Sequence, residues 1–418
     1  MNKKVRNLVG PIPDPEDLYG REDLLANLWR QIESNNILLL APRRFGKSGV
    51  MRHVLLLPKE GYLPISFDLE DVTTPEEFVW RMSRELLKHH KIRAVLQKAR
   101  RVPKAIREWV QDTFEEVGFE GAKVKFKNAI KDDWHNTART MLLELEKADD
   151  TIIFIFDELP SMLDNMIKHC GADVARQFMA WFRTVRLEHK DVLRRHRFIV
   201  AGSIGIDVIL RHIDAADKLV DFQRFYVEPL DRQYAIQLAT DLAESRDVTW
   251  NEELTEYLLH LIGLPVPYFI HLFFSQLAQL PCQKHHSITH HDLDEVYRQR
   301  VLGPSCKHYF EHYRTRLINR YGATGEKAAI SVLCAVAGSA HGLVSRSALY
   351  DVYRKARGKQ ASDIDFDGLL GDLENDWYLV LETKTNEYHF MLNVMRDWWK
   401  RWFPLSGSTR LSKGVTKS

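Results

Sequence analysis

The chain of 418 residues has few cysteines and no long apolar run, and both absences narrow its class. Its four cysteines, Cys170, Cys282, Cys306 and Cys334, are scattered and never form a C-x-x-C pair. This spacing argues against a zinc site and fits reduced thiols. The longest apolar stretch, from Ala328 to Gly338, is far shorter than the ~20 residues that cross a bilayer. The basic N-terminus lacks the apolar core of a signal peptide. We therefore expect a cytoplasmic protein without membrane contact.

An excess of one charge is also missing, since 59 Lys and Arg stand against 57 Asp and Glu, for a net charge of +2. The length predicts two to three domains. Positive charge is concentrated locally, because residues 88–107 carry eight Lys or Arg and no acid, and the tail 406–418 is basic. Such segments can bind the phosphate backbone of a nucleic acid. A solvated helix face has the same composition, and the sequence leaves both interpretations open.

A short apolar run precedes a phosphate-binding pattern. Residues 37–40 (ILLL) follow a turn-like segment and predict a buried strand, and a helix is expected from Gly49 to Leu57. Between them stand Ala41, Pro42, Arg43, Arg44, Phe45, Gly46, Lys47 and Ser48. They fit G-x-x-x-x-G-K-[ST] except that Ala41 replaces the first glycine. Strand, loop and helix together are the context in which this pattern predicts phosphate binding.

The chemistry of this loop is specific. Backbone N–H groups and the positive helix N-terminus surround an anion. Gly46 lets the backbone approach the phosphates, Lys47 would reach the β- and γ-phosphates, and the Ser48 hydroxyl would bind Mg²⁺. The methyl of Ala41 is tolerable unless that residue needs a positive φ. The loop therefore predicts ATP and Mg²⁺ as ligands.

A second apolar run ends in two carboxylates. Residues 151–156 (TIIFIF) predict a central parallel strand, and Asp157 and Glu158 follow it directly. In a Walker B arrangement Asp157 would hold Mg²⁺ and Glu158 would orient and polarise the attacking water. Two carboxylates that cap the following helix are the alternative, and the loop earlier in the chain favours the Walker B interpretation.

A third strand is predicted over residues 197–203. Ser203 at its tip could contact the γ-phosphate or the attacking water, or it could cap a helix that begins near Ile204.

These segments resemble a known family. The box Tyr19–Glu22, the loop APRRFGKS, the strand followed by DELPSML, the strand ending in VAGS and the tripeptide Gly263–Pro265 are similar to archaeal-type P-loop ATPases. Those proteins belong to the STAND and origin-recognition-like branch of the AAA+ proteins. The resemblance covers roughly residues 15 to 300. It implies an α/β fold with a three-layer P-loop core around a parallel sheet, a helical lid and a C-terminal winged helix.

The resemblance also implies further roles. Tyr19, Gly20 and Arg21 would lie along the adenine and ribose, and Gly263 and Pro265 would close over the base from the lid. With residues 41–49, Gly49 included, they form the expected nucleotide-binding set. An arginine after the third strand often acts on a neighbouring subunit's nucleotide, and here Arg224 occupies that place, with Arg211 as the second choice. A surface ion pair is the alternative for either arginine.

The expected domains follow the composition along the chain. We expect a core over 1–228 with an insert at about 85–135, a lid over 229–320, a winged helix over 321–405 and the basic tail. Within the insert, residues 121–127 (GAKVKFK) alternate apolar and basic side chains and predict a hairpin strand. A basic hairpin could contact nucleic acid, or it could be an edge strand protected by lysines.

The winged helix is predicted from three helices and two strands, over residues 326–338, 345–355, 363–375, 378–382 and 388–391. The positions of the third helix expected to be exposed are Asp363, Asp365, Asp367, Asp372, Glu374 and Asp376. A helix this acidic is repelled by phosphate, which favours a protein-binding or structural module over insertion into a DNA groove. Trp398, Trp399 and Trp402 are expected to pack the last helix.

Two functional classes follow. The first is a STAND-like switch that binds and slowly hydrolyses ATP, forms oligomers or engages a protein partner, and responds to ATP or ADP. The second is an initiator- or loader-like ATPase that binds DNA through the winged helix and the basic insert. The acidic third helix favours the switch, and the basic insert favours DNA.

Overall fold

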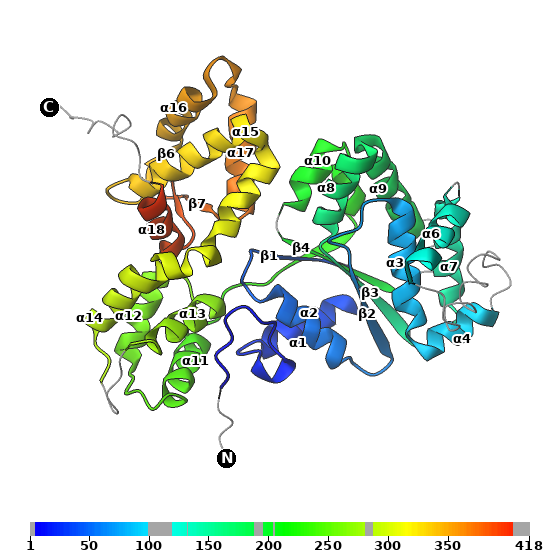
Figure 1. The fold of residues 1–418 in the computed structure, drawn as a ribbon, viewed down its shortest axis with the longest axis horizontal. Helices are drawn as coiled ribbons and strands as arrows, with labels where there is room; N and C mark the ends of the chain where they lie inside the picture. Colours follow the sequence, from blue (N-terminus) through cyan, green and yellow to red (C-terminus); the bar gives the residue numbers. More distant parts are fainter. Residues whose placement is uncertain are drawn as a thin grey trace. The chain divides into compact units, whose positions relative to one another are not determined.

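The computed structural model describes residues 5–98, 119–131, 133–187, 195–203, 205–280 and 287–403 (Figure 1). The chain divides into two compact units. We call Ile12–Glu228 the sheet unit, and Met1–Pro11 together with Pro229–Ser418 the helical unit.

Five parallel strands form the sheet of the sheet unit, in the order β2-β3-β4-β1-β5. They are β1 (Asn36–Ala41), β2 (Tyr62–Asp68), β3 (Thr151–Asp157), β4 (Arg197–Ser203) and β5 (Phe222–Tyr226). The strands β1 and β3 are buried almost throughout, as their unbroken apolar runs predict. The parallel sheet expected from the sequence is therefore confirmed.

Helices cover both faces of this sheet. They are α1 (Glu22–Ile32), α2 (Lys47–Leu56), α3 (Pro75–Leu87), α4 (His90–Lys98), α6 (Phe119–Ile130), α7 (Trp134–Leu145), α8 (Leu159–Cys170), α9 (Ala172–Leu187) and α10 (Ile206–His212), with short 3₁₀ turns at Pro15–Asp17 and Ala216–Leu219. In Figure 1, α1 and α2 lie on one side of the sheet and α8, α9 and α10 on the other. The three-layer α/β architecture is the one predicted.

The predicted hairpin strand at 121–127 is wrong, because these residues lie in helix α6. Phe126 and Ile130, four positions apart, are both buried, whereas Val124 is 58 % exposed. The ring of Phe126 packs against Trp80 of α3, with the ring centroids 5.2 Å apart. A short alternating stretch is ambiguous on its own, and contact with α3 decides for the helical period of 3.6 residues.

The helical unit begins with α11 (Arg232–Glu244), α12 (Glu252–Ile262), α13 (Pro267–Leu277) and α14 (His290–Glu295), then a π-helical turn (Val296–Val301) and a 3₁₀ turn (Pro304–Cys306). It continues with α15 (His308–Gly338), β6 (Val344–Ser345), α16 (Arg346–Arg357), a 3₁₀ turn (Gly358–Gln360), α17 (Asp363–Asn375), β7 (Leu379–Glu382), β8 (Glu387–Phe390) and α18 (Asn393–Trp402). The last three strands form an antiparallel sheet in the order β6-β8-β7. Helices with this small sheet make the predicted winged helix. The single helix α15 runs through residue 321.

Burial corrects one detail of α17. Asp363, Asp365 and Asp367 are exposed as expected, but Asp372 and Asp376 are only 5 % and 8 % exposed. The Asp372 carboxylate accepts a hydrogen bond from the hydroxyl of Tyr321, at 3.3 Å. Glu374 is half-buried, so most of the acidic surface of this helix lies in its first half.

The last helix is anchored by aromatic packing. Trp398 and Trp399 of α18 are fully buried, with ring centroids 5.3 Å apart, and the Trp398 ring stacks on Phe310 of α15 at 5.7 Å. These two tryptophans are packing residues, as predicted. Trp402 is partly exposed and has the Lys307 ammonium 4.4 Å from its ring centroid.

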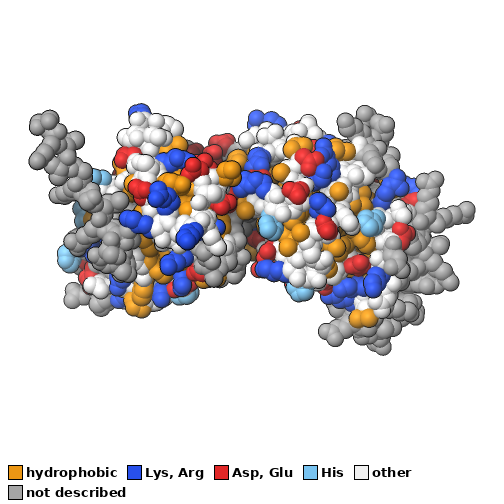
Figure 2. Space-filling view, turned by 90° about the horizontal axis from the view of Figure 1, so that it is seen from above, with side chains coloured by type: hydrophobic (Ala, Val, Ile, Leu, Met, Phe, Trp, Pro, Cys, Tyr) orange, Lys and Arg blue, Asp and Glu red, His pale blue; other side chains and the backbone are white. Residues whose placement is uncertain are grey.

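Charges of both signs mix on the surface. In the view of Figure 2, blue and red side chains are interspersed over the described residues. Within the described ranges, no single helix has the length and hydropathy of a membrane span, and only α12 with α13, bent by 113°, reaches them as a pair.

Candidate functional site

The loop between β1 and α2 contains two residues with a positive φ. Gly46 precedes α2 with φ 93° and ψ 12°, and Arg44 also has a positive φ of 74°. Only glycine adopts such angles readily. Between them the side chain of Phe45 is buried and anchors the loop, and Pro42 is buried as well. Ala41 belongs to β1 and has no positive φ, so its methyl group causes no backbone strain.

Gly49, the last residue of the expected phosphate-binding segment 41–49, has a packing role. A Cβ on Gly49 would lie 2.8 Å from Cγ of Pro13 and 2.9 Å from Cδ1 of Leu18, closer than real Cβ atoms come. The N-terminal segment thus presses directly on the first turn of α2, and this contact requires glycine. Ser48 is half-buried at the start of α2, and Arg43 is exposed.

The box before α1 lies against the same loop. Gly20 has a φ of 56°, Tyr19 is half-buried, and Arg21 is only 4 % exposed. The Nη2 group of Arg21 donates a hydrogen bond to the carbonyl oxygen of Phe45, at 3.4 Å. The structure therefore brings the box and the phosphate-binding loop together, and Arg21 braces the loop backbone.

Lys47 connects the two halves of the site. Its Nζ atom lies 3.2 Å from Oδ1 of Asp157 and 3.5 Å from Oε1 of Glu158. The lysine side chain is 11 % exposed, and the two carboxylates are 28 % and 25 % exposed. The fold thus brings together two motifs that lie about a hundred residues apart in the sequence, as the Walker A and Walker B interpretation requires.

Glu158 has an unusual backbone conformation. It stands between β3 and α8 with φ 57° and ψ 36°, in the left-handed region that non-glycine residues rarely adopt. Such strain costs roughly 1–3 kcal/mol and is concentrated at functional sites. Its N–H donates to Oδ1 of Asp157 at 3.0 Å, and its Oε2 accepts from the Ser161 hydroxyl at 3.1 Å. The Glu158 carboxylate is therefore held by Ser161 and Lys47, and the backbone of Glu158 is held by Asp157.

The donors at this edge fit magnesium. Mg²⁺ takes hard oxygen ligands and is held by one or two protein oxygens together with substrate phosphates. The hydroxyl of Ser48 and the carboxylate of Asp157, already directed at Lys47, supply oxygens of that kind. In the part of the chain that is described, no group of three or more His, Cys, Asp or Glu side chains could hold a metal ion by itself.

Of the remaining polar candidates of the sheet unit, two lie on the strands that flank β1 and one on helix α10. The register of β4 with β1 puts Ser203 beside Ala41, at the first position of the loop. Arg224 lies on β5, the strand on the other side of β1, and makes a two-pronged ion pair with Asp207 of α10 at 2.7 and 2.9 Å. The hydrogen bonds that Arg224 donates to the Asp207 carboxylate raise the pKa of Arg224. Arg211 is exposed on α10.

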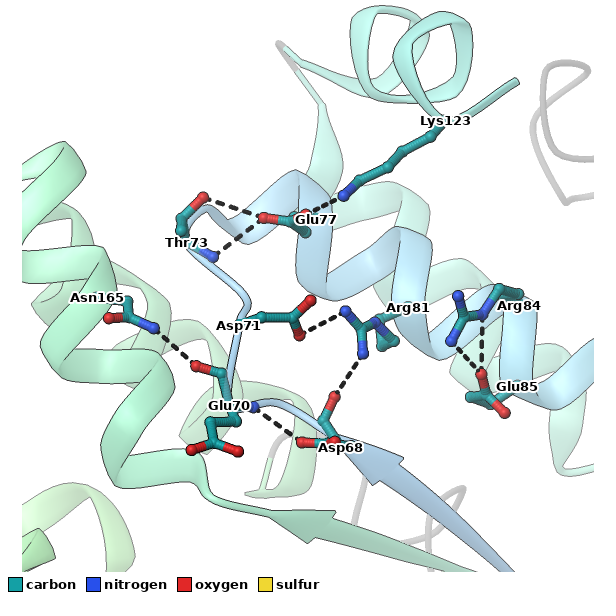
Figure 3. A network of polar contacts seen from close by, with 10 residues as sticks. All are labelled: Asp68, Glu70, Asp71, Thr73, Glu77, Arg81, Arg84, Glu85, Lys123 and Asn165. Carbon is teal, nitrogen blue, oxygen red and sulfur yellow. Dashed lines mark hydrogen bonds and ion pairs between the residues drawn. The ribbon is translucent and has the colours of Figure 1, made fainter. Parts of the chain in front are cut away.

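Sequence reasoning missed the loop after β2, which lies at the same edge because β2 pairs with β3. Figure 3 shows how it is held from two helices. Arg81 of α3 donates to the carbonyl of Asp68 at 3.1 Å and to Asp71 at 2.6 Å. Asn165 of α8 donates to the carbonyl of Glu70 at 2.7 Å. Acidic residues directly after an apolar strand, in DLED, were the signal that could have revealed it.

Gly263 and Pro265 belong to the helical unit and have structural roles there. Gly263 ends α12 with φ 102°, and a Cβ on it would lie 2.6 Å from the backbone nitrogen of Asn393 at the start of α18. The Asn393 side chain donates to the carbonyl of His260 at 2.8 Å. The carbonyl of Pro265 accepts from the N–H of Leu230, at 2.9 Å. This tripeptide therefore joins α12, α18 and the start of the helical unit.

No protein-family model matches the sequence, and a search of curated proteins finds no match. Solved structures do match over nearly the whole chain. A Walker-type ATPase of Pyrococcus abyssi has a TM-score of 0.64 at 17 % identity, covering 94 % of this chain and 99 % of its own. The ORC2 protein of Aeropyrum pernix, solved in ADPNP–ADP complexes, has a TM-score of 0.53 at 10 % identity, covering 95 % and 98 %. The chain therefore has the fold of these Walker-type and origin-recognition ATPases.

Proposed function

We propose that the protein binds ATP with Mg²⁺ and hydrolyses it slowly. The observation that carries this proposal is the Lys47 ammonium between Asp157 and Glu158, at the N-terminus of α2. The triphosphate would replace the carboxylates as the partner of Lys47. Ser48 and Asp157 would hold the metal ion, which neutralises charge on the phosphates. Glu158 would orient the attacking water.

Other residues would complete the nucleotide site. Ser203 and Arg224 would sense the γ-phosphate, Arg224 acting on the nucleotide of a neighbouring subunit after leaving Asp207. Tyr19 and Arg21 with Gly20 would line the adenine and ribose. Gly263 and Pro265 would approach the base as part of a lid over residues 229–320, followed by the winged helix over 321–405.

We further propose that the nucleotide state moves the helical unit. The chain leaves the sheet unit at Glu228 and enters the helical unit at Pro229. One residue before, the N–H of Val227 donates to the carbonyl of Leu40 at 2.9 Å, beside the start of the phosphate-binding loop. One residue after, Leu230 is bound to Pro265. Only Glu228 and Pro229 thus lie between Val227, which is hydrogen-bonded within the sheet unit, and Leu230, which is hydrogen-bonded within the helical unit. A short segment of this kind can act as a hinge.

The N-terminal segment makes a second covalent connection between Pro11 and Ile12. On its helical-unit side, Asn7 contacts Nδ1 of His271 in α13 at 2.9 Å. On its sheet-unit side, Asp14 accepts from Arg52 of α2 at 2.7 and 3.0 Å. The helix that would hold the phosphates is therefore tied to the N-terminal connection, and strand β1 before the loop is tied to the connection at Glu228. Shifts at the loop would reach the helical unit through these two contacts.

The partner of the switch is proposed to be a protein or a second copy. The exposed start of α17 carries Asp363, Asp365 and Asp367, of which Asp367 is paired with Arg346, and its acidic charge opposes a phosphate backbone. The initiator-like alternative depends on the basic residues 88–107, of which 99–107 lie outside the described residues, as does the tail. In the described part, Lys88 is paired with Glu85, and Lys91 with Asp150 at 2.7 Å.

The test is steady-state ATP turnover with and without duplex and single-stranded DNA, together with light-scattering mass in ATP and in ADP. We expect slow Mg²⁺-dependent turnover, a change of mass between the nucleotides, and less than a twofold effect of DNA. Turnover that is absent would refute the ATPase proposal. Strong stimulation by DNA that disappears with added salt would replace the protein-partner switch by the initiator-like alternative.

A further inference from the structure

The Walker B helix and the neighbouring strand touch through a proline ring and a glycine. Pro160 lies in the first turn of α8, two residues after Glu158, and is buried. Gly202 is buried in β4, one residue before Ser203. A Cβ built on Gly202 would lie 2.5 Å from Cγ and 2.7 Å from Cδ of Pro160. Real Cβ atoms do not come within 3.0 Å of a neighbour.

Glycine is required at position 202 because the Pro160 ring lies so close, and not because of the backbone angles of residue 202. The φ of Gly202 lies outside the left-handed region, so any residue could adopt its conformation. The atoms that press on it belong to a five-membered ring with a fixed φ, which cannot turn aside as a long flexible side chain would. A side chain at 202 must therefore displace the first turn of α8 or the tip of β4.

We propose that Pro160 and Gly202 are positioning residues that set the separation between Glu158 and Ser203. This inference rests on the proposed hydrolysis of ATP, in which Glu158 orients water and Ser203 meets the γ-phosphate. The ring holds the start of α8 against β4, and the register of β4 with β1 puts Gly202 beside Leu40, just before the phosphate-binding loop. The carboxylate, the strand tip and the loop are thus tied together at the carboxyl edge of the sheet.

The size of the effect follows from the geometry. Moving the ring from 2.5 Å to the 3.0 Å limit requires a displacement of about 0.5 Å, and ordinary contact at 3.4 Å requires about 1 Å. A misplacement of ~1 Å at reacting groups can reduce a rate by roughly 100-fold. Phosphate binding by Lys47 and the loop does not use this pair directly, so ATP affinity should change little.

The experiment compares Gly202→Ala, Pro160→Ala and the double variant in the full chain. Turnover, single-turnover rate, ATP affinity and thermal unfolding are measured for each. We expect Gly202→Ala to lower kcat by about 10- to 100-fold with ATP affinity within about threefold of the parent. Pro160→Ala should lower kcat by about 3- to 10-fold, because the start of α8 loses its contact with Gly202 but no atoms overlap.

The double variant is the decisive arm. Without the ring, the Cβ of residue 160 lies 4.0 Å from a Cβ at 202, which is an ordinary contact. Adding Gly202→Ala to the Pro160→Ala background should therefore be nearly neutral, so the double variant should turn over as fast as Pro160→Ala and faster than the single Gly202→Ala variant. A purely structural contact would lower thermal stability without separating kcat from ATP affinity.

Three results would overturn the inference: parent kcat in Gly202→Ala, parent kcat in Pro160→Ala, or a double variant no faster than Gly202→Ala. If Gly202→Ala does not fold, the comparison of Pro160→Ala with the double variant and the parent still decides. Failure of the proposed ATPase function looks different, because the parent itself would then show no turnover that depends on Lys47.

Discussion

The ionisable groups at the two edges of the central sheet differ in how far they are exposed to solvent. At the carboxyl edge Lys47, Asp157 and Glu158 contact one another and remain partly open to solvent. At the amino edge His196 and Glu146 also approach each other, at 3.6 Å, but the histidine side chain is fully buried and the glutamate is 14 % exposed. The charged side chains of the carboxyl edge are therefore partly exposed, whereas those of the amino edge are more deeply buried.

The pKa values of the amino edge show that burial suppresses charge there. Burial lowers the pKa of His196 from 6.5 to about 4, although a backbone hydrogen bond opposes the shift. Burial raises the pKa of Glu146 from 4.5 to about 7. Both groups are thus driven toward their neutral forms, and Nδ1 of His196 accepts from the N–H of Ile152 at 3.2 Å. At the amino edge of the sheet these two groups therefore serve packing, whereas we propose that the carboxyl edge binds the nucleotide.

The largest effect that would test this contrast is expected from Lys47→Ala. Losing charged hydrogen bonds worth ~3 kcal/mol weakens binding by roughly 100-fold. ATP affinity, measured by calorimetry, should fall by at least that factor. Lys59→Ala is the matched control, because Lys59 is exposed and paired with Glu33 at 2.9 Å. Normal ATP binding by Lys47→Ala would show that the site is misplaced.

The second test exchanges one glutamate at each edge. Glu158→Gln should lower turnover by about 100-fold or more while ATP still binds, because the amide cannot act as a base. Glu146→Gln should leave turnover within about twofold of the parent. Single-turnover kinetics with labelled ATP separate binding from hydrolysis. Equal losses in both variants would remove the distinction between the edges.

The carboxyl edge could be predicted because its signals are local. An apolar run followed by a loop with Gly46 and Lys47, and a second run followed by Asp157 and Glu158, each lie within about ten residues. The order of the strands then brings the two motifs together, since β4 alone separates β3 from β1. Charge and glycine at strand ends therefore carry information that does not depend on distant packing.

What could not be predicted depends on partners far along the chain. The alternation of Val124, Phe126 and their lysines predicts a strand where helix α6 lies, and only the contact with Trp80 selects the helix. Burial of Asp372 depends on Tyr321 in α15. The need for glycine at 202 depends on Pro160, which is 42 positions away. In each of these pairs the two residues are far apart in the sequence, so the residues next to either one do not indicate the contact.

The third test concerns pH and the amino edge. Between about pH 4.5 and 7, folded Glu146 holds a proton that the unfolded chain lacks, so its contribution falls as pH rises. Between about pH 4 and 6.5, unfolded His196 holds a proton that the folded chain lacks, so its contribution falls as pH drops. The two slopes oppose each other in the parent.

Single variants should separate these slopes. His196→Asn, which keeps an acceptor for Ile152, leaves only the glutamate and should gain stability as pH falls from 6.5 to 4.5. Glu146→Gln leaves only the histidine and should lose stability over the same interval. The difference between their free energies of unfolding should change by roughly 2–4 kcal/mol, measured with urea at each pH. The double variant is the control, and parallel curves for the two single variants would contradict the suppression of charge at this edge.

The smallest effect is expected from Ser161→Ala, which loosens the carboxyl edge without removing a charge. Its hydroxyl donates to Oε2 of Glu158 at 3.1 Å, and a hydrogen bond of this kind is worth about 1 kcal/mol. Turnover should fall by roughly fivefold at unchanged ATP affinity, because the carboxylate samples more orientations. Ser161→Thr keeps the hydroxyl and should restore the parent rate. Ser331→Ala removes a serine of α15 whose hydroxyl donates to the carbonyl of Lys327 at 2.7 Å, and this variant should have no effect. A threonine variant as slow as the alanine variant would mean that the space around residue 161, and not its hydrogen bond, holds Glu158 in place.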